Sequence, residues 1–215
     1  TQSRSSAASD VYKRQGLYHL AHSVHDMQEI TRRAYSNYLN GIDAEILNQE
    51  QVKKNIPHMN VNGRYPVLGA ILQRRAGTAR HDAVAWGYAR AAENLGVDII
   101  QNCEVTGIDI SNGAVTGLQT TKGSVKAKKV GLVPAGHSSV LADMAGFRLP
   151  ISSVPLQALV SEPIKPILDC VIMSNTVHVY VSQSDKGELV VGAGSDSYNS
   201  YSQRGLSLIH ISEPT

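Results

Sequence analysis

The chain has few of the residues that mark several common classes of protein. Its 215 residues include only two cysteines, Cys103 and Cys170, which lie far apart and outside any Cys-x-x-Cys pair, so a disulfide framework and a zinc site are disfavoured. No apolar run is long enough to cross a bilayer, and no secretory signal peptide is recognisable. A formal net charge of +2 with mixed signs argues against a nucleic-acid-binding surface. We therefore expect a cytoplasmic protein.

Large aromatic side chains are also scarce. With one Trp and one Phe, the core has to be filled by Leu, Ile, Val and Ala. The length allows one or two domains with a sizeable core, and there are no internal repeats.

The two ends of the chain look foreign to the rest. Residues 1–15 and 206–215 resemble translated sequencing-adaptor sequence, and we exclude both from arguments about fold and targeting. The N-terminal segment is polar, Ser-rich and without apolar periodicity, so we expect it to be disordered. The alternative is a natural Ser-rich tail and a short C-terminal strand. On the first interpretation the natural fragment runs from about Gly16 to Gly205.

The most informative stretch of the sequence runs over residues 73–90. Three arginines and a histidine precede or begin a predicted helix: Arg74, Arg75, Arg80 and His81. Asp82 can cap the first turn, an apolar face follows at helical spacing, and Gly96 ends the helix. That face consists of Ala83, Val84, Trp86, Ala89, Ala92 and Leu95. A helix N-terminus beside arginines suits an anion such as a phosphate, although a histidine there can also simply pack or hydrogen-bond.

The N-terminal third of the natural fragment has a helical pattern. Apolar residues at helical spacing between Leu20 and Ile30 predict a helix in the segment from residue 16, and a second short helix is expected over 43–54. Three histidines, His19, His22 and His25, lie three residues apart. Because a step of three drifts around a helix of 3.6 residues per turn and no carboxylate completes the set, we expect no metal site.

From residue 97 onward the pattern changes to strands. Apolar alternation predicts a strand over 97–105, and Asn112-Gly113 is typical of a type I′ hairpin. A further turn is expected at Lys122-Gly123, with a strand returning over 125–133. Three later apolar strands are predicted over 156–160, 177–181 and 189–191.

Several blocks of the sequence, in order, resemble one family. They are Asn40–Glu45, Ala79–Val84, Gly96–Gln101, Pro155–Pro166 and Ser182–Gly187. Most of the chain resembles the beta subunits of heterotetrameric sarcosine oxidases, within the D-amino-acid-oxidase-like FAD-dependent oxidoreductases. Ala76-Gly77 stands where that family usually has two glycines.

The resemblance implies an α/β (α+β) fold of the D-amino-acid-oxidase type that is incomplete here. Residues 16–70 would be the helical part of a substrate domain, and 71–150 part of the FAD-binding domain with the FMN attachment site. Residues 151–205 would supply the antiparallel sheet of the substrate domain.

The resemblance also assigns cofactors to individual residues. His81 matches the histidine that carries FMN covalently, through the 8α-methyl group of the flavin, and Arg80, Arg75 and Arg74 would lie near that FMN. Non-covalent FAD would be lined by Val105, Ala135 and Gly136, for which a core valine and a tight turn are the alternatives. The Gly-x-Gly-x-x-Gly fingerprint is absent, so we expect this fragment alone not to bind FAD tightly.

The activity implied by the family is oxidative demethylation of sarcosine to glycine. Hydrogen peroxide would form, and the one-carbon unit would pass to tetrahydrofolate on the alpha subunit or leave as formaldehyde, with gamma and delta subunits completing the complex. The isolated fragment is expected to be inactive. Alternatives are an oxidase or dehydrogenase of another secondary or tertiary amine, such as dimethylglycine or an opine, a non-catalytic flavoprotein subunit, and a fragment without function.

The residues that act on the substrate stay unassigned. His178 and Tyr180 are candidates, because side chains two apart in a predicted strand share a face. An ordinary half-buried strand face is the alternative.

Overall fold

The computed structural model describes residues 12–195 of the chain. Predictions about residues 1–11 and 206–215 lie outside this range. Contacts divide the described residues into unit 1, with residues 12–88 and 157–194, and unit 2, with residues 89–156 and Ser195. The chain passes between these units at residues 89 and 157, because residues 69–73 are a strand of the sheet of unit 1 and the chain leaves that unit only within the following helix. The assignment of domains with bounds at 71 and 151 stays a prediction.

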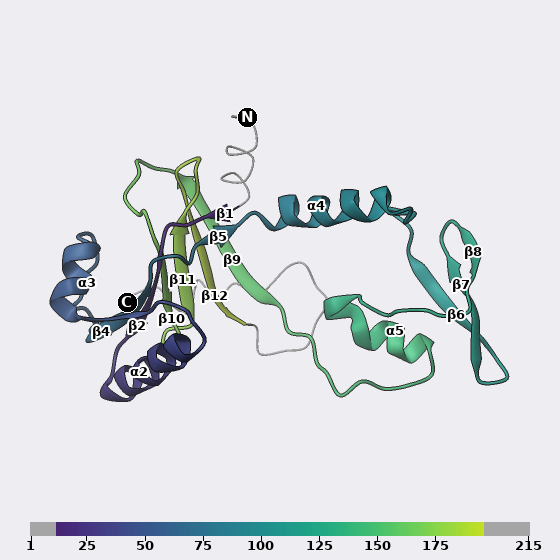
Figure 1. The fold of residues 1–215 in the computed structure, drawn as a ribbon, viewed down its shortest axis with the longest axis horizontal. Coiled ribbons are helices and arrows are strands. Elements are labelled where there is room, and N and C mark those ends of the chain that lie inside the picture. The colour runs from purple at the N-terminus through teal and green to yellow at the C-terminus, as the bar shows by residue number, and fades with distance from the viewer. Residues whose placement is uncertain (1–11, 196–215) are drawn as a thin grey trace. The chain divides into compact units, whose positions relative to one another are not determined.

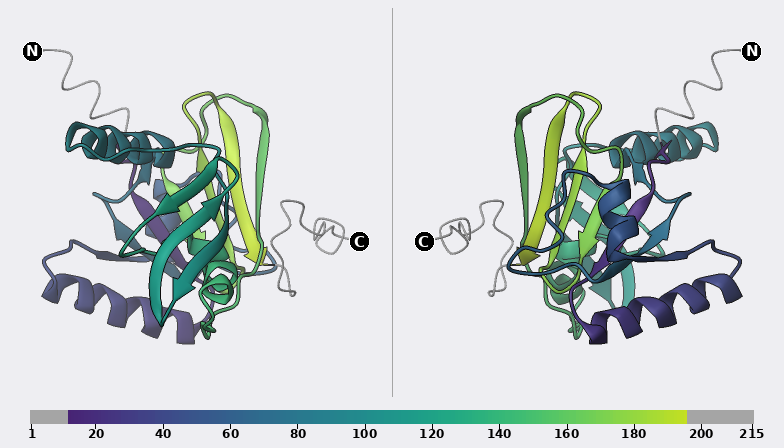
Figure 2. Two further views of the ribbon diagram at one scale, coloured as in Figure 1. Left: turned by 90° about the vertical axis from the view of Figure 1, so that its right-hand side faces the viewer. Right: turned by 90° about the vertical axis from the view of Figure 1, so that its left-hand side faces the viewer.

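Unit 1 contains a seven-stranded sheet (Figure 1; turned by 90° in Figure 2). In spatial order its strands are β3 (Glu45–Asn48), β4 (Gly69–Gln73), β2 (Leu17–Ala21), β10 (Val171–Ser174), β11 (Val179–Gln183), β12 (Glu188–Ser195) and β9 (Leu156–Pro163). β2 runs parallel to β10 and antiparallel to β4, while β11 is antiparallel to both β10 and β12. The prediction of antiparallel strands after residue 155 is confirmed.

Two helices cover opposite faces of this sheet. Ile71 of β4 packs with Ile30 and Ala34 of α2 (Val24–Leu39), whereas its neighbour Leu72 packs with Val52 of α3 (Gln49–Asn55). Because successive side chains of a strand point to opposite faces, the two clusters lie on the two sides of the sheet.

The starts of both helices are capped. The Ser23 hydroxyl accepts a hydrogen bond from the Asp26 amide at 3.1 Å, and Asn48 and Gln51 form a reciprocal capping box.

The helical prediction for residues 16–54 is only partly correct. α2 and the second helix are present, but Leu17–Ala21 and Glu45–Asn48 are strands. Both segments pair with β4, which lies more than twenty residues further along the chain. The spacing of apolar residues within a segment cannot predict a strand partner at that distance.

A short ribbon pairs β1 (Tyr12–Lys13) with β5 (Thr78–Ala79). The expected disorder of residues 1–15 therefore does not extend to Tyr12 and Lys13, whose backbone groups are satisfied by β5.

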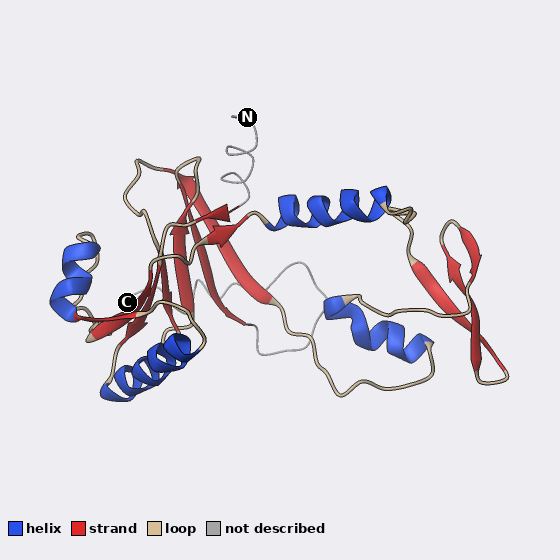
Figure 3. Cartoon of the chain, in the orientation of Figure 1, coloured by secondary structure: helices blue, strands red, loops and turns tan. Residues whose placement is uncertain are grey.

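Unit 2 carries a three-stranded sheet of β6 (Val105–Ser111), β7 (Ala114–Thr120) and β8 (Gly123–Lys126). Asn112 and Gly113 have φ values of 52° and 75°, which confirms the predicted type I′ turn. The predicted strands over 97–104 and 127–133 are wrong: both segments are loops (Figure 3). No strand among residues 12–195 pairs with either segment, so their extended pattern has no hydrogen-bonding neighbour.

The predicted helix is present as α4 (His81–Asn94). Gly96 ends it with φ at +87°, and the Val97 amide bonds back to the Ala92 carbonyl at 3.1 Å. Its start differs by two residues from the expectation. The Arg80 carbonyl accepts from the Val84 amide, so Arg80 holds the capping position and Asp82 lies in the first turn. The expected apolar face is not buried among the described residues.

Neither cysteine forms a disulfide, and the Cys170 thiol is buried at the start of β10. Burial, and secondarily the charge of Asp169, raises the pKa of Cys170 from 9.0 to about 12. No helix of residues 12–195 is long and apolar enough to cross a membrane.

Cys170 should therefore resist alkylation in the folded protein. At pH 8, iodoacetamide is expected to modify Cys170 only after unfolding. The half-buried Cys103 is the internal reference, and modification of each cysteine is measured by peptide mass.

The pKa of the Cys170 thiol is near 9.0 in the unfolded chain and near 12 in the folded protein. The contribution of the neutral thiol to the free energy of unfolding is therefore complete below pH 9 and is lost as the pH rises toward 12. Modification of Cys170 in folded protein at pH 8 would contradict its burial.

Candidate functional site

A groove of unit 1 lies between the start of α4 and the β11–β12 turn. It has a volume of about 920 Å³. One wall comes from residues 78–82, and the other from residues 182–186 with Glu188 and Val190. Lys13 also lines it, from the ribbon strand β1. Segments a hundred residues apart in the chain thus face each other across one space.

His81 and Arg80 stand side by side on the helical wall of this groove. His81 is the first residue of α4, and its side chain is exposed. The Arg80 Nη2 atom donates to Asp185 Oδ2 at 2.9 Å. The sequence-based placement of an exposed imidazole at a helix entry is therefore confirmed, and the groove supplies space for a ligand beside it.

Asp185 lies on the opposite wall and receives two cations. Lys13 Nζ donates to its Oδ1 at 2.8 Å, in addition to the bond from Arg80. Hydrogen bonds from Lys13 and then Arg80 hold the pKa of the Asp185 carboxyl below its usual range, so Asp185 is ionised at neutral pH. Because Lys13 belongs to the N-terminal segment that resembles adaptor sequence, Arg80 is the partner supplied by the rest of the chain.

Arg74 and Arg75 do not reach the groove. Arg74 forms a bidentate ion pair with Glu45, with one bond at 2.8 Å, and Arg75 pairs with Asp43. The hydrogen bond from Arg74 lowers the pKa of Glu45. Of the three arginines predicted near the flavin, the structure brings only Arg80 to His81, because the other two neutralise carboxylates next to and on the edge strand β3.

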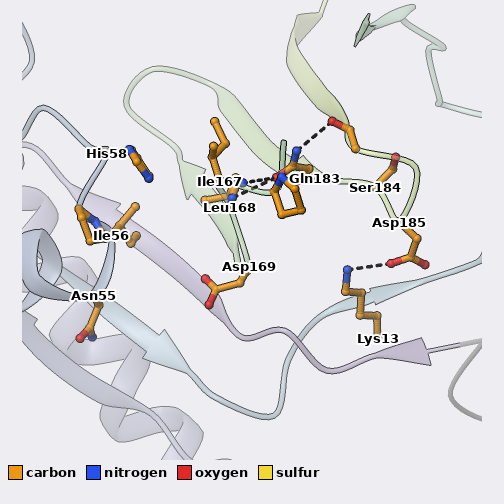
Figure 4. A pocket seen from close by; sticks show the side chains of 13 residues that line it. Lys13, Asn55, Ile56, His58, Ile167, Leu168, Asp169, Gln183, Ser184 and Asp185 are labelled. Atoms are coloured by element: carbon orange, nitrogen blue, oxygen red, sulfur yellow. Dashed lines mark hydrogen bonds and ion pairs between the residues drawn. The ribbon is translucent and has the colours of Figure 1, made fainter. Parts of the chain in front are cut away.

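The turn that carries Asp185 is held by a buried glutamine. The Gln183 side-chain oxygen accepts from the Ile167 and Leu168 amides at 2.8 and 3.0 Å, and its nitrogen donates to the carbonyls of Lys165 and Gly187 at 3.1 and 2.9 Å. Figure 4 shows Gln183 between the 166–169 segment and this turn, in an adjacent groove of about 470 Å³. Gln183 thus ties the turn to the body of unit 1.

The residues predicted to line FAD lie in unit 2. Val105 is the half-buried first residue of β6, and Ala135 and Gly136 open the short helix η1 (Ala135–His137) before α5 (Ser138–Met144). Ala135 has φ at +49°, a left-handed conformation that few residues with a side chain adopt. Both small residues are exposed, and a Cβ built on Gly136 meets only Ser153 Oγ, at 3.9 Å. Their backbone is therefore open to a ligand, while a role with FAD stays a prediction.

The candidates on the substrate side do not share a strand face. His178 lies in the turn before β11 with φ at +51°, so the expectation that it is a strand residue is wrong. The left-handed turn of the β10–β11 hairpin interrupts the alternation on which the pairing with Tyr180 depended. Tyr180 does lie in β11, and its ring covers Gly192 of β12, where a Cβ would come within 2.0 Å of the ring. Neither residue lines the groove at His81.

His19 and His22 have different hydrogen-bond partners. His19 is buried in β2, where its Nδ1 is bonded to Arg33 at 2.8 Å, and His22 Nε2 bonds Ser174 at 2.9 Å. Burial, followed by the charge of Arg33, lowers the pKa of His19. No group of three potential metal ligands is found among the described residues.

Asp185 was not among the site residues predicted from the sequence. It lies within a block that resembles the family, Ser182–Gly187, but its partner Arg80 is 105 positions away. Gly187 nearby predicts a turn at Asp185, but no local pattern predicts which element that turn faces.

Comparisons with known proteins agree on one family. The model of the DAO family, described as FAD dependent oxidoreductase, matches residues 3–211. The chain is 55% identical over 206 residues to the sarcosine oxidase subunit beta of Rhodobacter capsulatus, covering 95% of this chain and 50% of the relative. It is 56% identical over 205 residues to that of Arthrobacter sp., covering 94% and 50%. The chain therefore spans about half the length of the curated relatives it matches.

Solved structures show the same fold at low identity. L-proline dehydrogenase from P. horikoshii superimposes with a TM-score of 0.84 at 21% identity, over 96% of this chain and 55% of that one. Glycine oxidase from Bacillus cereus gives 0.75 at 20% identity, over 98% and 58%. The predicted fold class is confirmed. The family match also reaches into both end segments, so their foreign origin stays a prediction.

Proposed function

Because the chain belongs to the DAO family of FAD dependent oxidoreductases, we propose that it is part of the flavin-bearing subunit of a sarcosine-oxidising enzyme. The identities of 55% and 56% to sarcosine oxidase beta subunits support this activity over those of the structural neighbours, which are about 20% identical. Since half of each relative lies outside the chain, the activity is proposed for the whole polypeptide.

The observation that carries the proposal is the exposed His81 beside Arg80 in the groove. A flavin tether needs an imidazole that solvent and ligand can reach, and His81 is exposed at the first residue of a fourteen-residue helix. The volume of about 920 Å³ lies in the range of cofactor sites. Amide groups at the start of α4 and the guanidinium of Arg80 favour a bound anion. The residues present therefore fit a covalently held FMN.

Each residue then has a defined task. His81 would hold the flavin through an imidazole nitrogen, and Arg80 would pair with its phosphate or with negative charge on its ring. Bound flavins would supply the redox chemistry, namely acceptance of a hydride from the amine by FAD and, with the electrons passed on to FMN, reduction of oxygen to hydrogen peroxide. The protein contributes orientation and charge.

The second cofactor belongs to unit 2 in this proposal. Val105, Ala135 and Gly136 would line non-covalent FAD, supported by the open backbone at Ala135 and Gly136. The proposed partners are the alpha, gamma and delta subunits, with tetrahydrofolate bound by alpha as acceptor of the one-carbon unit, and the proposed location is the cytoplasm. Tyr180 stays the candidate on the amine side.

The proposal is tested on the full-length polypeptide produced with its partner subunits. The complex is denatured in acid and digested, and the peptide containing His81 is examined for the added mass of FMN and flavin absorbance. Complete release of flavin into the acid supernatant would refute the covalent site. Turnover with sarcosine, dimethylglycine and opines then separates the enzyme hypotheses, and inactivity with all of them favours a non-catalytic flavoprotein subunit.

A further inference from the structure

The proposed function gives no role to Asp185, whose carboxylate lines the groove. Asp185 faces the start of α4 from the β11–β12 turn, and Arg80 reaches it across 105 positions of sequence. An anionic flavin would gain nothing directly from a negative charge in its groove. A carboxylate at this place therefore acts through the cations it binds, Lys13 and Arg80, of which Arg80 is the neighbour of His81.

The turn that presents Asp185 is built to hold its position. Ser184 Oγ accepts from the amides of Lys186 and Glu188, both at 3.2 Å, and donates to the Glu188 carboxylate at 2.6 Å. Gly187 closes the turn with φ at +95°, where a Cβ would lie 2.6 Å from the Ile164 carbonyl oxygen. The buried side chain of Gln183 fastens the turn to residues 164–168. Hydrogen bonds from Ser184 and Gln183 thus hold the turn that carries Asp185 in one conformation.

The guanidinium of Arg80 is held at one nitrogen only. A guanidinium has five N–H donors in a fixed planar arrangement, and the bond from Nη2 to Asp185 restrains the position of the group while leaving the other donors available. Within residues 12–195, no other acceptor is hydrogen-bonded to the Arg80 side chain. The remaining donors can serve a ligand beside His81.

We propose that Asp185 is a positioning residue that orients the Arg80 guanidinium for the flavin held at His81. This rests on the proposed function, since it assigns a partner within the same groove. Without Asp185, the Arg80 side chain would keep its charge, but its guanidinium would no longer be held in one orientation beside His81. Because exposed ion pairs contribute little to folding, the loss should appear in flavin attachment and not in stability.

The test follows attachment of FMN to the full-length polypeptide, produced without flavin together with its partner subunits. After addition of FMN, acid-stable flavin on the His81 peptide is measured against time. Asp185→Ala should slow attachment roughly tenfold or more, the size expected from a misdirected group. Asp185→Asn, which keeps an acceptor oxygen, should recover part of the rate. Asp143→Ala, an exposed aspartate of α5, is the matched control and should attach flavin at the wild-type rate.

A second comparison separates positioning from a merely structural role. In an Arg80→Lys background, Asp185→Ala should change the rate less than twofold, since lysine has no fixed plane to orient. Equal slowing in both backgrounds, or attachment at the wild-type rate in Asp185→Ala, would overturn the proposal. If wild type carries no acid-stable flavin, the proposed function fails instead, so the two failures are distinguishable.

Discussion

Replacement of His81 by alanine should abolish acid-stable flavin while leaving FAD bound. The imidazole is an exposed nucleophilic group at the groove, and alanine has no atom with which to form the bond to the flavin. FAD is assigned to Val105, Ala135 and Gly136 of unit 2, so its binding should not depend on His81. The measurement is flavin in the acid pellet against flavin in the acid supernatant of the full-length complex.

A histidine of similar exposure provides the control for this change. His25 lies on the exposed side of α2, and His25→Ala should keep acid-stable flavin at the wild-type level. Acid-stable flavin that persists in His81→Ala would place the attachment at another residue.

Replacement of Gln183 by leucine should cause a large loss of stability. The buried amide accepts from two backbone N–H groups and donates to backbone carbonyls of residues 164, 165 and 187. Leucine fills a similar volume but leaves these groups without partners. Since each buried unsatisfied group costs about 1–3 kcal/mol, the free energy of unfolding should fall by about 3–5 kcal/mol. Denaturant unfolding of the full-length polypeptide measures this difference.

The matched control for this change is Gln28→Leu on the exposed side of α2. It should alter the free energy of unfolding by no more than about 0.5 kcal/mol, as expected for surface substitutions. A Gln183→Leu variant as stable as Gln28→Leu would show that water or rearranged backbone replaces the glutamine amide. Gln183→Glu is a second variant for the same measurement. Its carboxylate can still accept from the Ile167 and Leu168 amides, but it has no N–H group to donate to the carbonyls of Lys165 and Gly187.

Local signals predicted the elements whose geometry is local. The helix from His81 ends at Gly96 because a left-handed residue there closes its last turn, and the Asn112-Gly113 turn needs positive φ at both positions. Leu17–Ala21 was expected to be helical because its apolar residues continue the spacing of α2. It is a strand because β4 and β10 both pair with it, from 48 or more positions further along the chain.

The candidate site divides in the same way. His81 could be found because its neighbours form a local pattern that resembles one family. Arg74 and Arg75 carry the same charge as Arg80 and lie only a few residues before it, so sequence placed all three near the flavin. Their partners Glu45 and Asp43 direct two of them away from the groove.

By itself, the sequence determined the family, the helix entry at His81 and the turns, since these depend on residues close together in the chain. The tertiary structure alone decided which arginine faces His81 and that Asp185 lies opposite. Those facts depend on which strands pair, and strand pairing joins segments that no local pattern connects.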